Sequence, residues 1–213
     1  MTAEYILKEL NITEEVVAIF PYGSRVYGLD TEKSDYDYIV VFKKSILPNG
    51  AFRNNAVSNK DKSIQAVIYS RSGFIDAINN YEIGALECLS LDSSEVVLKK
   101  WPFKITKWNE KDMIKKIIQK ASASWHIADE QSKNGFKDNA KKGIFHALRI
   151  LEFGLQLKNN QKVVDFKSCN NLYLEFKNIN PEDFDTRNYT SMRDDLMGKL
   201  RSGDMTYPNP STK

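Results

Sequence analysis

Residues Phe20 to Phe42 read FPYGSRVYGLDTEKSDYDYIVVF. The stretch lies across two apolar runs, and each run predicts a buried strand. The first run ends at a glycine-serine turn, Gly23-Ser24, and the second begins after Asp35-Tyr36-Asp37. A tight turn and a pair of aspartates therefore stand between two predicted strands, and these residues are the first candidates for a functional site.

Asp35 and Asp37 are candidate ligands of a divalent cation. Side chains alternate across a strand, so aspartates two residues apart are expected on the same face. Two carboxylates on one face repel each other, and a cation between them removes that cost. No histidine or cysteine stands near them in the sequence, so the ligands would all be oxygens. Mg2+ or Mn2+ is the expected ion.

Gly23 and Ser24 are candidate phosphate-binding residues. Glycine lets the backbone approach a ligand closely, and Ser24 can begin a helical segment whose N–H groups face an anion. Arg25 follows directly, and we expect its guanidinium to contact phosphate. Carboxylates for a metal beside a phosphate-binding turn indicate phosphoryl or nucleotidyl transfer.

This combination resembles the signature of the DNA polymerase β-like nucleotidyltransferase superfamily, here Gly23-Ser24, then Gly28, then Ser34-Asp35-Tyr36-Asp37. The longer string GSRVYGLDTEKSDYDY is most similar to a subgroup of small bacterial and phage nucleotidyltransferases, some of them associated with RNA ligases. The resemblance implies an α+β fold. We expect a nucleotidyltransferase core with a mixed β-sheet flanked by helices, followed by a C-terminal helical bundle.

The resemblance also implies a third carboxylate, and here the sequence departs from it. Residues Ser63 to Tyr69 predict the next strand, with alternate residues from Ile64 to Ile68 on one face and from Gln65 to Tyr69 on the other. The subgroup is expected to carry the acid four residues before the tyrosine that ends this strand. That position holds Gln65. Glutamine is a neutral ligand and cannot act as the base that deprotonates an attacking hydroxyl.

Three interpretations of Gln65 stay open. The catalytic metal is lost or weakened, which leaves a nucleotide- or RNA-binding pseudoenzyme. Alternatively another acid replaces the third carboxylate, with Asp61 and Glu87 as the nearest candidates, although a structural role for Glu87 is favoured. In the third interpretation the two aspartates suffice, because phosphoryl transfer depends mostly on positioning and charge neutralisation.

The reaction implied by the resemblance is transfer of a nucleoside monophosphate from a nucleoside triphosphate, such as ATP, to an acceptor hydroxyl with loss of pyrophosphate. The acceptor is an RNA end, a protein side chain or a small molecule. The association of the subgroup with RNA ligases makes RNA the leading expectation, by analogy alone. The nucleotide is expected between the core and the helical region.

Helical spacing beyond Trp101-Pro102 predicts a second domain. We expect a nucleotidyltransferase core over residues 1–102, a helical domain over 103–201 that closes over the nucleotide, and a loosely ordered tail over 202–213. Residues 43–62 are expected to form a loop or irregular hairpin, and 93–100 an edge strand or connector. The expected helices cover residues 2–10, 72–80, 84–91, 110–133, 137–157, 168–176 and 191–200. Thr2, Ser72 and Asn109 are the expected N-caps of the helices that begin at these residues or directly after them.

Lys142, His146 and Arg149 are spaced i, i+4 and i+7 in one predicted helix and would share a stripe. Lysine can bind a triphosphate as a point charge, arginine as a bidentate fork and histidine as a donor. Nucleotidyltransferases similar to this chain commonly close over the nucleotide from such a helix. A solvated basic face with a satisfied histidine is the alternative, and both interpretations stay open.

The composition is that of a globular protein. With 213 residues and 41% hydrophobic content the chain can bury a real core, and its net charge of +3 suits a phosphate-rich ligand without requiring nucleic acid. Its two cysteines predict buried reduced thiols, not a disulfide framework. No apolar run approaches the roughly 18 residues of a membrane span, and no signal-peptide pattern opens the sequence. We therefore expect a cytoplasmic protein with no membrane partner; its oligomeric state is not encoded in any motif.

Overall fold

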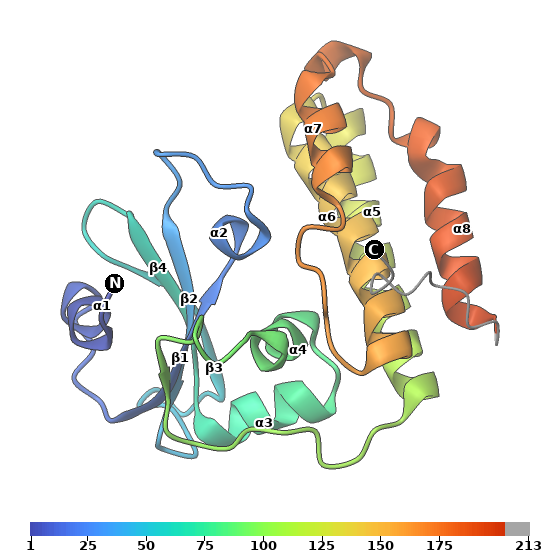
Figure 1. Cartoon of the computed structure of the whole chain (residues 1–213). Coiled ribbons are helices and arrows are strands. Elements are labelled where there is room, and N and C mark those ends of the chain that lie inside the picture. The colour runs from blue at the N-terminus through green and yellow to red at the C-terminus, as the bar shows by residue number, and fades with distance from the viewer. Residues whose placement is uncertain (203–213) are drawn as a thin grey trace. The chain divides into compact units, whose positions relative to one another are not determined.

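The computed structural model describes residues 1–202, apart from the side chains of residues 54–56 (Figure 1). The predicted tail, residues 202–213, lies outside the described residues except for Ser202. The chain divides into two compact units, Met1–Trp108 and Asn109–Lys213. The first is built on a mixed sheet and the second on helices, which is the α+β class predicted from the sequence.

The first unit contains a five-stranded sheet in the order β3-β4-β2-β1-β5. The parallel pair in this sheet is β2 with β4, and the other neighbouring strands run antiparallel. The strands are β1 (Val16–Tyr22), β2 (Tyr36–Phe42), β3 (Arg53–Ser58), β4 (Ile64–Tyr69) and β5 (Leu98–Lys99).

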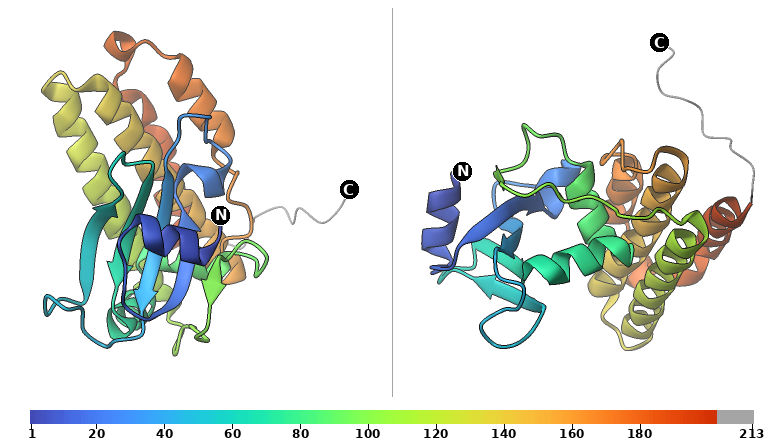
Figure 2. Two further views of the ribbon diagram at one scale, coloured as in Figure 1. Left: turned by 90° about the vertical axis from the view of Figure 1, so that its left-hand side faces the viewer. Right: turned by 90° about the horizontal axis from the view of Figure 1, so that it is seen from below.

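Helices cover both faces of this sheet (Figures 1 and 2). On one face Ile6 of α1 packs in a cluster with Ile64 and Ile68 of β4. On the opposite face Tyr69 of β4 packs with Phe74 of α3, their rings meeting edge to face at 5.5 Å. The alternation predicted along β4 is therefore correct. The helices of this unit are α1 (Ala3–Glu9), α2 (Ser24–Tyr27), α3 (Arg71–Asn79) and α4 (Ile83–Ser90).

Side-chain caps fix where these helices begin. Thr2 accepts a hydrogen bond of 3.3 Å from the backbone N–H of Tyr5 and begins α1, as predicted. The N-cap of α3 lies two residues before the predicted one, because Ser70 accepts the capping bond from the N–H of Gly73 at 3.0 Å. The predicted cap, Ser72, instead donates its hydroxyl to the backbone carbonyl of Ser45.

Two predictions about irregular segments are refined by strand pairing. The region 43–62 contains β3, which pairs antiparallel with β4 and so forms the first strand of a hairpin. Within 93–100 the paired strand is short: Val97 N–H donates to Ile19 O at 3.2 Å, and Lys100 N–H donates to Val17 O at 2.7 Å. The second pairing depends on contacts between residues far apart in the chain.

The division between the units falls at Trp108, six residues beyond the position expected from the Trp101-Pro102 break. The intervening residues pack on the first unit. Phe103 is buried, and its ring meets that of Phe74 edge to face at 4.9 Å. Tyr81 donates its hydroxyl to the carbonyl of Lys107 at 3.0 Å. An aromatic-rich segment after the proline therefore belongs to the core domain.

The second unit begins with two long helices, α5 (Glu110–Lys133) and α6 (Lys137–Asn160), which are joined by a short turn. Asn109 caps α5 as predicted, accepting a hydrogen bond of 3.3 Å from the N–H of Asp112. The unit continues with α7 (Asn170–Asn178), two short 3₁₀ turns, η1 (Pro181–Asp183) and η2 (Thr186–Tyr189), and α8 (Thr190–Arg201). Over the part of the chain that the structure describes, no helix is both long enough and apolar enough to cross a bilayer.

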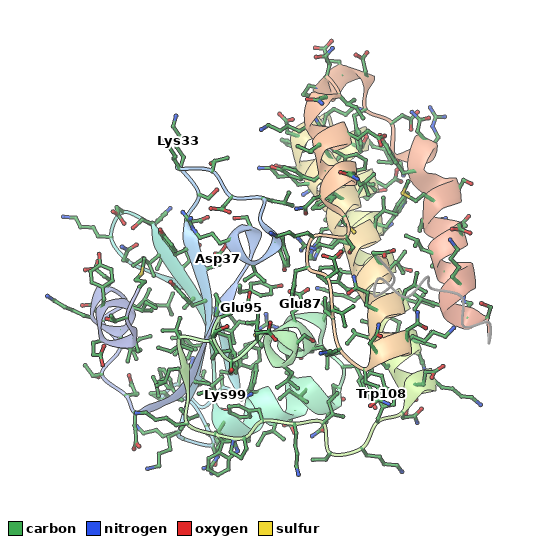
Figure 3. All side chains as sticks on the ribbon, viewed as in Figure 1. Lys33, Asp37, Glu87, Glu95, Lys99 and Trp108 are labelled. Atoms are coloured by element: carbon green, nitrogen blue, oxygen red, sulfur yellow. The ribbon has the colours of Figure 1, made fainter. Side chains whose placement is uncertain are left out.

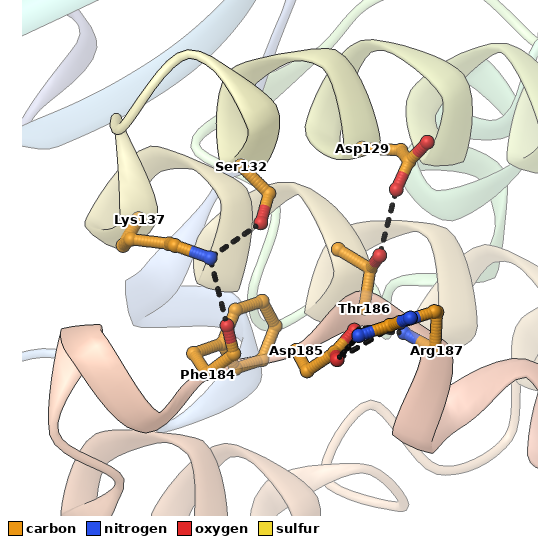
Figure 4. A network of polar contacts seen from close by, with 7 residues as sticks. All are labelled: Asp129, Ser132, Lys137, Phe184, Asp185, Thr186 and Arg187. Atoms are coloured by element: carbon orange, nitrogen blue, oxygen red, sulfur yellow. Dashed lines mark hydrogen bonds and ion pairs between the residues drawn. The ribbon is translucent and has the colours of Figure 1, made fainter.

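A polar network ties the segment between α7 and α8 to the two long helices (Figure 4). Lys137 donates its ammonium to Ser132 Oγ and to the carbonyl of Phe184, each at 3.1 Å. Thr186 donates its hydroxyl to Asp129 at 2.7 Å. These bonds join three elements of the bundle, so we assign the network a structural role.

Candidate functional site

The glycine-serine turn and the two aspartates meet at one end of the sheet. The antiparallel register of β1 and β2 places Tyr22 opposite Asp37, so Gly23 follows β1 at the point where β2 begins. Asp35 precedes β2 directly, and both aspartates are half-buried. Asp37 is labelled at this end of β2 in Figure 3. Residues predicted from two separate motifs therefore share one place in the fold.

Gly23 adopts a conformation and a contact that require glycine. Its φ is +79°, in the left-handed region that L side chains rarely adopt. A Cβ added at Gly23 would lie 3.1 Å from Cβ and Cγ of Asp37 and closer still to the carboxylate oxygen Oδ2. The carboxylate of Asp37 therefore packs against the turn itself, and nothing larger than hydrogen fits between them.

Ser24 begins α2, a single helical turn that ends at Gly28 with φ +65°. The backbone N–H of Val26 donates to Gly23 O at 3.0 Å, and the N–H of Leu29 donates to Ser24 O at 3.0 Å. These bonds close the turn around the predicted phosphate-binding residues. The side chain of Ser24 is half-exposed at this position.

A buried hydrogen bond joins α2 to α4. Tyr27 donates its hydroxyl to Glu87 Oε2 at 2.7 Å, and both residues are almost fully buried, with 2% and 3% of their surface exposed. Figure 3 labels Glu87 on α4. This carboxylate supports the helical turn after Gly23. The sequence did not single out Tyr27, because its partner lies 60 residues further along the chain.

Gln65 lies at the position where the third carboxylate was expected. Parallel pairing of β2 with β4 places it beside Asp37, on the same face. Its amide Nε2 donates a hydrogen bond to Oδ2 of Asp35. The three side chains thus gather in one cluster, and the amide contributes a donor where an acid would contribute a charge.

The two acids suggested as replacements for the third carboxylate are held by other partners. Glu87 binds Tyr27 as described. Asp61 accepts hydrogen bonds from the N–H and the hydroxyl of Ser63, at 3.0 and 2.7 Å, and these bonds hold the pKa of the Asp61 carboxyl below its usual value. Among residues 1–202, no group of three histidine, cysteine, aspartate or glutamate side chains is arranged to hold a metal.

The electrostatics of the aspartate pair suit a cation. Burial, and secondarily the negative charge of Asp35, raise the pKa of Asp37 from 3.8 to about 6. The donor set consists of two carboxylates and one amide, all of which can offer oxygen. Mg2+ is commonly held by one or two carboxylates with substrate phosphates completing its ligands, so these residues fit such an ion bound together with a nucleotide.

Arg25 is engaged by the segment that leads into β2. Its guanidinium donates Nε to Asp35 O at 3.1 Å, Nη2 to Ser34 O, and Nη1 to the carboxylate of Asp30 at 2.9 Å. It also lies over the ring of Tyr36, 3.7 Å from the centroid. The phosphate contact predicted for Arg25 stays a prediction. The contacts observed give this residue a role in positioning the backbone of Asp35.

Lys142, His146 and Arg149 lie on α6, in the second unit, and differ sharply in exposure. Lys142 is exposed, His146 is half-buried, and Arg149 is buried with 9% of its surface exposed. The stripe predicted to project as a whole therefore runs from solvent into the helical core. A ligand shared by all three residues stays a prediction.

Arg149 and His146 form a contact of their own. Arg149 Nη2 lies 3.0 Å from His146 Nδ1, and the guanidinium lies near the rings of Phe145 and Phe153, 5.6 and 5.9 Å from their centroids. Burial, together with the positive charges of Arg149 and Lys120, lowers the pKa of His146 to about 4. The imidazole is therefore neutral near pH 7 and can accept a hydrogen bond from the guanidinium.

Neither a protein-family model nor a curated protein matches this sequence. Among solved structures, the chain is similar to a nucleotidyltransferase-like protein from Exiguobacterium sibiricum, with 12% sequence identity and a TM-score of 0.36. The match covers 93% of this chain and 73% of that one. None of the three comparisons assigns a substrate or a reaction to this chain.

Proposed function

We propose that this protein is a metal-dependent nucleotidyltransferase, which transfers a nucleoside monophosphate from a nucleoside triphosphate to an acceptor hydroxyl and releases pyrophosphate. The observation that carries the proposal is the contact of Asp37 with Gly23. It sets a half-buried carboxylate directly against the glycine-serine turn, so that the groups proposed to hold a metal and a phosphate lie side by side. A metal-bound polyphosphate needs this combination of groups.

The residues of the site have distinct roles in this proposal. Gly23 and Ser24 hold the outer phosphates of the nucleotide through the backbone of the turn. Asp35 and Asp37 hold Mg2+ or Mn2+, and the bound ion would neutralise phosphate charge. Tyr27 and Arg25 keep the turn and the aspartates in place. Catalysis by such a site depends on positioning and on charge neutralisation, which the two aspartates and the turn can provide.

Gln65 limits the proton chemistry of the site. A side-chain amide does not accept a proton near neutral pH, so the acceptor hydroxyl would have to react without a base at this position. Loose transition states of phosphoryl transfer tolerate this, since the nucleophile forms little bond before the leaving group departs. We therefore expect slow turnover. An RNA end is the leading candidate for the acceptor, a choice that rests on the sequence resemblance.

The hydrogen bond from Gln65 to Asp35 favours a second candidate function. If the amide keeps a cation from Asp35, the protein binds a nucleotide or RNA without turning it over. Such a pseudoenzyme would gain thermal stability with a nucleoside triphosphate and would release no pyrophosphate.

A transfer screen separates the two functions. Labelled nucleoside triphosphates are incubated with pools of RNA, protein and small-molecule acceptors in Mg2+, Mn2+ or EDTA. Pyrophosphate release that requires the metal, and that Asp37→Asn abolishes, supports the transferase. The matched control is Asp76→Asn, which makes the same change at an exposed position on α3 and should leave the rate unchanged. Stabilisation by nucleotide with no transfer in any pool supports the pseudoenzyme.

A further inference from the structure

Asp35 is held from two sides by other groups of the chain. Its backbone carbonyl accepts a hydrogen bond of 3.1 Å from Arg25 Nε, and the preceding carbonyl, of Ser34, accepts one from Nη2 of the same guanidinium. Its side-chain oxygen Oδ2 accepts the bond from the amide of Gln65. The backbone and the carboxylate of Asp35 are therefore both fixed, and the donor that fixes the carboxylate is Gln65.

The amide of Gln65 does for this carboxylate part of what a cation would do. A carboxylate beside a second carboxylate is stabilised by any donor directed at it, because the donor places partial positive charge against the negative oxygen. The same geometry makes the donor a competitor. A metal that takes Oδ2 as a ligand must displace the amide hydrogen bond, whereas an acid at position 65 would add a ligand without first having to be displaced.

We propose that Gln65 is a placeholder for the cation: its amide stabilises the Asp35 carboxylate by a hydrogen bond and is displaced when a divalent ion binds the aspartates. The inference rests on the proposed function in that it concerns the same two aspartates. It deepens that function by making metal binding an exchange, in which the ion replaces an internal donor. Weak binding of metal alone, and stronger binding when nucleotide phosphates add ligands, follow from it.

The test is Mn2+ binding in the absence of nucleotide, measured from the electron paramagnetic resonance signal of the free ion. In Gln65→Met the side chain keeps its length but loses the donor, and its thioether is a poor ligand for a hard ion. We expect this variant to bind Mn2+ about tenfold more tightly than wild type, the order expected for losing a competing hydrogen bond to a charged group. Gln65→Glu, which supplies a third carboxylate, should bind more tightly again. Gln119→Glu, at an exposed position on α5, is the matched control and should leave the affinity unchanged.

Thermal unfolding gives a second measurement. In EDTA, Gln65→Met should melt at a lower temperature than wild type, because Asp35 loses its donor, and saturating Mn2+ should raise its melting temperature by more than it raises that of wild type.

Weaker Mn2+ binding by Gln65→Met would overturn the proposal, because it would make Gln65 a metal ligand through its own oxygen. Unchanged affinity, or no binding by wild type and variants alike, would also overturn it. The proposed transferase activity is tested separately. If Mn2+ binds as expected but the transfer screen shows no pyrophosphate release, the role of Gln65 is supported and the transferase activity is contradicted.

Discussion

The carboxylate of Asp37 lies against the α-carbon of Gly23, so that a single added methyl group would overlap it. The two residues belong to different parts of the sheet, Gly23 to the turn after β1 and Asp37 to the start of β2. Their contact is what turns two short sequence motifs into one site.

The first prediction concerns this contact. Gly23→Ala should destabilise the protein by about 1–3 kcal/mol more than Gly50→Ala, the penalty typical of forcing an extra methyl group into a packed site. Gly50 is the matched control because its φ is +77°, close to the +79° of Gly23, while a Cβ there would meet nothing within 4 Å. Both variants place an L residue at positive φ, and the ψ of −157° at Gly23 adds to the cost there because this region is essentially restricted to glycine. Urea unfolding measures the difference, and equal losses would show that Asp37 does not occupy the space beside Gly23.

The second prediction concerns pH. The pKa of Asp37 is raised from 3.8 to about 6 in the folded protein, first by burial and then by Asp35. The folded state therefore binds this proton more tightly than the unfolded chain does. Protonation of Asp37 contributes its full share to the stability of the fold below about pH 4, and this contribution is lost as pH rises through about 6. Asp37→Asn removes this dependence. In EDTA at pH 7.5 the variant should be more stable than wild type by about 1–2 kcal/mol, since one pKa unit corresponds to about 1.4 kcal/mol and solvent screens part of the effect at this half-buried carboxylate.

The advantage of Asp37→Asn should vanish near pH 4 in urea titrations across the pH range. Asp35→Asn should lower the pKa of Asp37 in the folded protein, because it removes the second cause of the shift while burial remains. The stability linked to the Asp37 proton should then be lost at a lower pH than in wild type. A variant whose stability relative to wild type is the same at every pH would contradict the raised pKa of Asp37.

The third prediction separates positioning from phosphate contact at Arg25. If the guanidinium positions Asp35, Arg25→Lys should weaken nucleotide binding nearly as much as Arg25→Ala, because an ammonium cannot reach several acceptors in a planar fork. We expect each variant to lose about 1–2 kcal/mol of stability, for hydrogen bonds and stacking on Tyr36. Retention of most of the affinity by the lysine variant would favour direct phosphate contact.

Arg53→Lys is the control for the arginine series. Arg53 pairs with Glu82 at 3.4 Å and lies over the ring of Tyr69, 5.1 Å from the centroid, but it is exposed. An exposed ion pair of this kind contributes little, so the change should cost less than about 1 kcal/mol and leave nucleotide binding unchanged.

The fourth prediction concerns the support beneath α2. Tyr27→Phe removes a donor from the buried carboxylate of Glu87, and we expect a loss of about 1–3 kcal/mol, the cost of a buried group deprived of a hydrogen bond. Tyr69→Phe makes the same change where the hydroxyl donates to the exposed Glu82 at 3.2 Å, so water can replace the lost bond. Chemical denaturation of the two variants side by side measures the contrast, and a smaller loss for Tyr27→Phe would contradict it.

The parts of the fold that the sequence predicted are those governed by local rules. The cap at Asn109 and the alternation along β4 depend on neighbours within a few residues, and both are correct. The strand β3 was not predicted because residues 43–62 are mostly polar and carry no clear alternation, and β3 is held by its pairing with β4. The late end of the first unit depends on how Phe103 packs, which no local pattern encodes.

The candidate site divides in the same way. Residue types and spacing pointed to Gly23, Asp35 and Asp37, and the structure gathers them. The position of Gln65 beside Asp37 could not be derived from the sequence alone, because it depends on the register between β2 and β4. The engagement of Arg25 could not be predicted, because its partners include backbone carbonyls, which every residue offers equally.

The central claim is that the two aspartates and the glycine-serine turn together hold a metal-bound polyphosphate. Isothermal titration with ATP, and with inorganic triphosphate as a probe that carries no base, tests it most directly when wild type and Asp37→Asn are compared in Mg2+ and in EDTA. We predict binding of both probes by wild type in Mg2+, and affinity at least about tenfold weaker in EDTA or in Asp37→Asn, as expected for the loss of a charged contact. Binding that is indifferent both to Mg2+ and to the loss of the Asp37 charge would contradict the claim.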